Sequence, residues 1–129
     1  MEKTWKILIV DDEEDLTWSL SRKLGRAPSN LDVVCANSGL KALEVLQATP
    51  IDLVLTDLRM PGINGLQLLS EIRSKYPQTR VIVMTAYGSP EIQEAINHWG
   101  ETEYIEKPFE INELRRLIFN QLAHDTTSI

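Results

Sequence analysis

Acidic side chains directly follow two apolar segments of this sequence. Residues 7–10 run into Asp11 and Asp12, and residues 51–56 run into Asp57. Short apolar runs bounded by turn and helix signals are typical of buried strands. If these strands lie parallel and side by side, the three carboxylates meet at one end of a sheet, where each close pair repels by about 4 kcal/mol at an effective dielectric of about 20. Oxygen ligands and net negative charge suit a hard divalent cation, so the sequence predicts a site for Mg²⁺, which Mn²⁺ could replace.

Further polar residues fit the chemistry of phosphoryl transfer. A turn at Pro61 and Gly62 follows Asp57, which we expect to leave its carboxylate exposed at the end of a strand. An aspartate can attack phosphorus and hold the phosphoryl group as an acyl phosphate. Thr85 ends a predicted strand and offers a hydroxyl donor, and Lys107 follows another and offers an ammonium. Asp57, Thr85 and Lys107 are therefore the candidate catalytic residues.

Each of these residues also has a purely structural explanation. Asp11 and Asp12 could stabilise a helix N-terminus, and Asp57 could form a turn. Thr85 could be an ordinary strand residue, and Lys107 an ordinary surface lysine. The predicted topology nevertheless brings all five to the same edge of one sheet, which favours the functional interpretation.

Strand and helix patterns alternate along the chain. Apolar runs predict five strands, at residues 6–10, 32–36, 53–56, 80–85 and 103–106. Apolar residues at helical spacing predict five helices, at residues 15–25, 38–48, 65–76, 90–99 and 111–123, with Leu40 on the buried face of the second. This alternation predicts an α/β fold, a doubly wound five-stranded parallel sheet with helices on both faces. Such sheets bind ligands beyond the carboxyl ends of their strands.

Length and composition predict one domain. The 129 residues would form a core over about 6–123, followed by a short polar tail at 124–129. The net charge of −6 argues against direct nucleic-acid binding. We expect no membrane segment and no signal peptide, because no apolar stretch reaches the required length. The single cysteine, Cys35, lies in an apolar run, so we expect it to be buried, and its isolation fits a cytoplasmic protein.

Four segments share their order, spacing and strand context with a known family. They are Ile7-Leu8-Ile9-Val10-Asp11-Asp12, residues 56–65, Met84-Thr85-Ala86 and residues 104–109. Together they resemble the receiver domain of two-component response regulators, over about residues 6–123. The resemblance implies the flavodoxin-like strand order 2-1-3-4-5. It also implies a phosphoryl group received from a sensor histidine kinase or a phosphotransfer protein.

The resemblance assigns a role to each residue of the acidic cluster. Asp57 looks like the phosphoacceptor. Asp12 and Asp57 look like direct Mg²⁺ ligands, with Asp11 acting largely through water, and the main-chain carbonyl of Arg59 would be the third protein ligand. The domain would catalyse its own phosphorylation and a slow autodephosphorylation, without being an enzyme for a separate substrate. Bulky residues at Arg59 and Tyr87 would slow the hydrolysis by restricting water.

The resemblance also implies a conformational switch. Thr85 and Lys107 would hold the phosphoryl group, and Tyr104 would turn inward as the hydroxyl moves toward it. The residues alone favour a core position for Tyr104, which remains an alternative for its resting state. The chain departs from the family at Glu101 and Thr102, in the segment that leads to this switch.

The output would lie on a protein surface. The resemblance implies an effector domain or protein, such as a transcription activator, that is missing from this chain or separate from it. A homodimer could form through the face of the fourth and fifth helices. Trp99, at the end of the fourth predicted helix, would either pack in the core or belong to this face.

Three other classes of protein fit the sequence less well. A phosphatase of the dehalogenase type needs a second acid two residues after the nucleophile, and this chain has Arg59 there. An interaction module that is never phosphorylated would not need the set formed by Asp11, Asp12, Asp57, Thr85 and Lys107. Nucleotide-binding proteins of the common classes carry glycine-rich phosphate loops that this sequence lacks.

Overall fold

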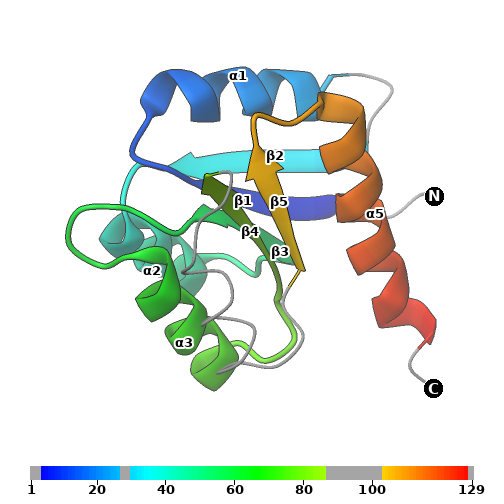
Figure 1. Ribbon diagram of the computed structural model, residues 1–129. Coiled ribbons are helices and arrows are strands. Elements are labelled where there is room, and N and C mark those ends of the chain that lie inside the picture. Colours follow the sequence, from blue (N-terminus) through cyan, green and yellow to red (C-terminus); the bar gives the residue numbers. More distant parts are fainter. Residues whose placement is uncertain (1–3, 27–29, 87–102, 128–129) are drawn as a thin grey trace.

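The computed structural model describes residues 4–26, 30–86 and 103–127, and contains one five-stranded sheet (Figure 1). All strand pairings are parallel, in the order β2-β1-β3-β4-β5. The strands are β1 (Trp5–Val10), β2 (Leu31–Ala36), β3 (Leu53–Asp57), β4 (Arg80–Ala86) and β5 (Glu103–Lys107). The predicted fold class and strand order are thereby confirmed. Each strand is one residue longer than predicted: β1 and β2 begin one residue earlier, and β3, β4 and β5 end one residue later.

The central strands owe their position to uninterrupted apolar sequence. Residues 7–10 of β1, 53–56 of β3 and 81–85 of β4 are all buried, because both faces of a doubly wound parallel sheet are covered. The outer strands β2 and β5 each contain both buried and exposed positions. Ile7 of β1 pairs with Leu53 of β3, and this register sets the carboxyl ends of the two strands level.

Four helices lie within the described residues, and they cover the two faces of the sheet in pairs. They are α1 (Glu14–Leu24), α2 (Gly39–Ala48), α3 (Gly65–Lys75) and α5 (Ile111–Thr127). Helices α1 and α5 pack on one face, whereas α2 and α3 pack on the other (Figure 1). The predicted helix over 90–99 falls outside the described residues.

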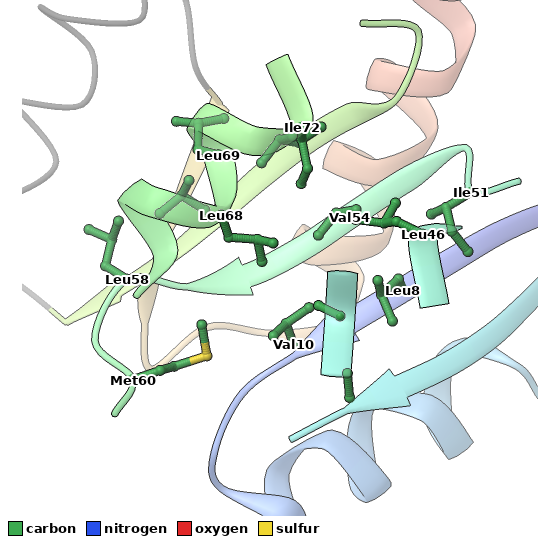
Figure 2. Close-up of a cluster of buried hydrophobic side chains, with 14 residues drawn as sticks. Leu8, Val10, Leu46, Ile51, Val54, Leu58, Met60, Leu68, Leu69 and Ile72 are labelled. Atoms are coloured by element: carbon green, nitrogen blue, oxygen red, sulfur yellow. The ribbon is translucent and has the colours of Figure 1, made fainter. Parts of the chain in front are cut away.

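Alternate residues of β1 point into two separate cores. Leu8 and Val10 join the core under α2 and α3 (Figure 2), while Ile7 and Ile9 join the core under α1 and α5. This is the two-residue repeat of a strand with both faces buried. Helix α3 begins at Gly65 as predicted. The side chain of Asn64, the residue before it, accepts from the amide of Gln67 in a reciprocal capping box.

Two burial predictions were wrong. Cys35 is exposed rather than buried, because β2 is an edge strand; its thiol still donates to the main-chain oxygen of Thr17 in α1, 3.5 Å away. Leu40, expected on the buried face of α2, is 61% exposed in the first turn of that helix. Within the described residues, no helix is long and apolar enough to span a membrane.

Candidate functional site

The three aspartates predicted to cluster do so at the carboxyl edge of the sheet. Asp57 is the last residue of β3, while Asp11 and Asp12 directly follow β1, its parallel neighbour. One carboxylate oxygen from each residue lies within 4.8 Å of the others. Asp11 is fully buried, Asp12 is exposed, and the side chain of Asp57 is 14% exposed. Asp57 is therefore more sheltered than the turn after it suggested.

A single lysine bridges two of these carboxylates. Lys107, the last residue of β5, places its Nζ 3.0 Å from Oδ2 of Asp11 and 3.2 Å from Oδ2 of Asp57. A third acid, Glu13, lies 3.9 Å from the same ammonium and was not predicted. Burial alone would lower the pKa of Lys107, but the hydrogen bond that it donates to Asp11 and the negative charge of Asp57 together hold that pKa above its ordinary value.

Local hydrogen bonds orient the carboxylates of Asp11 and Asp57. The Glu13 amide donates to Oδ1 of Asp11 over 2.9 Å, which leaves Oδ2 directed to Lys107. The Arg59 amide makes a longer hydrogen bond of 3.4 Å to Oδ1 of Asp57. Each carboxylate therefore has one oxygen held by a backbone amide and the other held by the ammonium. The Arg59 side chain is exposed.

Two glycines shape the turn that follows Asp57. Gly62 has φ of 76°, a left-handed conformation that favours glycine. At Gly65 a Cβ atom would lie 2.2 Å from the main-chain oxygen of Asp57 and 2.7 Å from Cα of Leu58, closer than any real contact. The Gly65 amide also donates to the Leu58 carbonyl over 2.9 Å. The sequence marked Gly65 only as a helix start; its place behind an asparagine cap was the one available signal of this close approach.

The two residues of the predicted switch occupy different environments. Thr85 is buried next to the end of β4, and its hydroxyl donates to the main-chain oxygen of Ala86 over 3.3 Å. Within the described residues it forms no hydrogen bond with Asp57 or Lys107. Tyr104 is 40% exposed on β5, so the core position considered for its resting state is wrong.

Comparison with known proteins decides the family. The family model named response regulator receiver domain matches residues 7–119 of the sequence. This chain is a response regulator receiver domain. Receiver domains are phosphoacceptor switches of two-component systems, and the acidic cluster described above is compatible with a metal site in such a domain.

Curated relatives include full-length transcriptional regulators. The receiver domain is 34% identical over 118 residues to the DNA-binding transcriptional regulator NtrC of Escherichia coli strain K12, covering 92% of this chain and 25% of NtrC. It is 39% identical over 117 residues to the response regulator protein PilR of Pseudomonas aeruginosa, covering 91% of this chain and 26% of PilR. The chain thus spans about a quarter of the length of these relatives.

Solved structures share the fold over the whole chain. A CheY-like response regulator receiver domain protein from Methanospirillum hungatei JF-1 superposes with a TM-score of 0.88 at 25% identity. The match covers 98% of this receiver domain and 100% of that chain.

Proposed function

We propose that this receiver domain accepts a phosphoryl group on Asp57 from a sensor histidine kinase or a phosphotransfer protein, in a Mg²⁺-dependent reaction. The observation that carries the proposal is the setting of Asp57. Its carboxylate lies within 4.8 Å of two others and 3.2 Å from the ammonium of Lys107. A nucleophile, candidate metal ligands and a phosphate-binding cation are therefore within reach of one another.

The donor set suits the proposed cation. Asp12, Asp57 and the main-chain carbonyl of Arg59 would hold Mg²⁺ directly, and Mn²⁺ accepts the same oxygen ligands. The hydrogen bond that Asp11 accepts from Lys107 supports a role for Asp11 through water rather than as a direct ligand. When bound, the cation would neutralise charge on the incoming phosphoryl group.

The chain's own groups can account for the transfer. An oxygen of Asp57 forms a bond to phosphorus as the phosphorus–nitrogen bond of the donor histidine breaks, and the released imidazole takes up a proton. Lys107 would move from the carboxylates to the phosphoryl oxygens, which carry about two negative charges. Later attack by water returns the carboxylate and inorganic phosphate, and Arg59, whose side chain lies exposed two residues away, would restrict that water.

The switch would run through the hydroxyl of Thr85. Its present hydrogen bond to Ala86 is long, and a phosphoryl oxygen is a stronger acceptor, worth about 1.5–3 kcal/mol when the hydrogen bond is charge-assisted. As Thr85 moves, Tyr104 would turn from its exposed position toward the sheet. The changed surface would then act on an effector, which the similarity to NtrC suggests is a transcription regulator. The homodimer through the fourth and fifth helices stays a prediction, because residues 87–102 lie outside the described residues.

Replacing the phosphoacceptor tests the proposal directly. We expect Asp57→Asn to abolish labelling by acetyl phosphate in millimolar Mg²⁺, because the amide is not a nucleophile for phosphorus. Asp32→Asn is the matched control, since Asp32 of β2 pairs with Lys6 of β1 near the opposite end of the sheet. Loss of the Asp32 carboxylate should leave labelling intact. Intact-protein mass spectrometry measures the label on both variants.

Labelling of Asp57→Asn at the wild-type level would contradict the assignment of the phosphoacceptor. Labelling of wild type that persists unchanged in excess EDTA would contradict the metal requirement while leaving Asp57 in place.

A further inference from the structure

An exposed tryptophan lies in the middle of α1. Trp18 is 61% exposed, although tryptophan is the side chain with the most apolar surface to bury. The Arg22 guanidinium lies over the indole, 4.8 Å from the ring centroid, in the geometry of a cation–π contact. The position contributes to neither of the two cores, so folding does not explain an indole there.

The tryptophan borders a basic hollow on the surface. The hollow has a volume of about 390 Å³ and is lined by Trp18, Ser19, Arg22, Lys23 and Arg26. No acidic residue lines it. Within residues 4–26, 30–86 and 103–127, no carboxylate forms an ion pair with Arg22, Lys23 or Arg26. These three residues are exposed, and no carboxylate of the described residues pairs with them, although the net charge of the chain is −6.

The helix that carries the hollow is anchored to the rest of the fold. The Arg115 guanidinium of α5 donates to the main-chain oxygen of Lys23 over 2.8 Å, which ties the last turn of α1 to its neighbour. Leu20 and Leu24 anchor the opposite face of α1 in the core. A surface that is already ordered loses less entropy when a ligand binds to it.

We propose that this hollow is a docking site for an acidic peptide segment of a partner protein. Carboxylates of the segment would pair with Arg22 and Arg26, and one apolar side chain would pack on the exposed face of Trp18. Aromatic residues and arginine are the side chains that dominate protein interfaces. A nucleic acid fits less well, because three cations on an acidic domain neutralise few phosphates.

A short synthetic peptide tests the site. The probe is a fluorescein-labelled hexapeptide with one phenylalanine flanked by glutamates and aspartates, and anisotropy measures its binding at low salt. We expect the Kd to rise at least tenfold in Trp18→Ser and in the double variant Arg22→Glu, Arg26→Glu. Lys41→Glu, which removes an exposed cation of α2, is the matched control and should bind like wild type.

Two further readouts separate docking from damage to the fold. The indole N–H resonance that disappears in Trp18→Ser should shift when the peptide is added to wild type. All variants should still be labelled by acetyl phosphate, since none of these residues belongs to the phosphoryl-transfer site. Equal binding of wild type and Trp18→Ser would overturn the proposal. So would equal binding of a peptide with glycine in place of phenylalanine, or tighter binding of an oligothymidine of matched charge.

Discussion

At the scale of single residues, Lys107 serves as the internal counterion of the site. It bridges Asp11, which is fully buried, and Asp57, which is nearly so. Without a positive charge, two carboxylates this close would destabilise each other and would each lack a solvent shell. The ammonium that would later hold the phosphoryl group thus stabilises the fold before any phosphoryl group arrives.

Removing that counterion should destabilise the domain. We expect Lys107→Met to lower the free energy of unfolding by about 1–3 kcal/mol in metal-free buffer, because it leaves a buried carboxylate unpaired. Lys6→Met is the control, since Lys6 pairs with Asp32 at 2.8 Å but on the surface, where such a pair contributes about 1 kcal/mol or less. Urea unfolding measures both. Equal losses for the two variants would show that burial of the Lys107 pair has no energetic consequence.

The thiol of Cys35 gives a second prediction at this scale. Although the residue as a whole is exposed, its thiol lies against α1, and this partial burial raises the pKa of the thiol; side-chain hydrogen bonds with Ser21 and Thr17 offset the rise only in part. The raised pKa means that the folded state favours the neutral thiol. The neutral thiol therefore contributes to the free energy of unfolding below the pKa of the unfolded chain, and this contribution is lost as pH rises through the pKa of the folded state. We therefore expect native Cys35 to react with a disulfide reagent with a pH midpoint above that of the urea-denatured chain. The two midpoints would coincide if the thiol were fully solvated.

At the scale of elements, the turn between β3 and α3 holds Asp57 in place. Helix α3 begins against the last residues of β3, and Gly65 makes the approach possible because it has no side chain. We expect Gly65→Ala to destabilise the domain by about 1–3 kcal/mol, the usual effect of overpacking. It should also slow phosphorylation by acetyl phosphate, since the displaced atoms belong to Asp57 itself.

The control for Gly65→Ala lies on the same helix. Ser74→Ala changes an exposed position near the end of α3 and should alter neither stability nor labelling. Thermal melts and labelling time courses measure both variants. A Gly65→Ala protein with wild-type stability and labelling would mean that α3 can shift without moving the phosphoacceptor.

The elements themselves could be predicted from the sequence because the central strands are apolar throughout. Because apolar residues point to both faces of these strands, both faces must be covered. The alternation of strands with helices then allows few topologies. The same patterns do not reveal which strand forms an edge, and for this reason Cys35 on β2 was wrongly expected to be buried. The burial prediction for Leu40 was wrong because this residue lies in the first turn of α2, where an apolar side chain can point away from the sheet.

The sequence predicted that the three aspartates and Lys107 lie close together, but not which contacts they make. The topology alone brings Asp11, Asp57 and Lys107 to one edge, because each ends or follows a parallel strand. The ion pair of Lys107 with Asp11 depends on how β1, β3, β4 and β5 are aligned with one another. No local sequence pattern determines that alignment. The contact of Glu13 with Lys107 and the outward position of Tyr104 are side-chain placements, which sequence spacing does not determine.

At the scale of the whole molecule, an excess of negative charge is concentrated where the proposed cation would bind. A ligand that binds only the folded state stabilises it by an amount set by its concentration and Kd, so Mg²⁺ at ten times its Kd should add about 1.4 kcal/mol. For a domain of this size that corresponds to a rise in Tm of about 5 °C. NaCl at the same ionic strength is the control that separates specific binding from screening. In Asp12→Asn, which lacks an exposed candidate ligand, most of the rise in Tm should disappear. A Tm that responds equally to both salts would mean that the three carboxylates form no metal site, and the proposed Mg²⁺ dependence of phosphorylation would lose its structural basis.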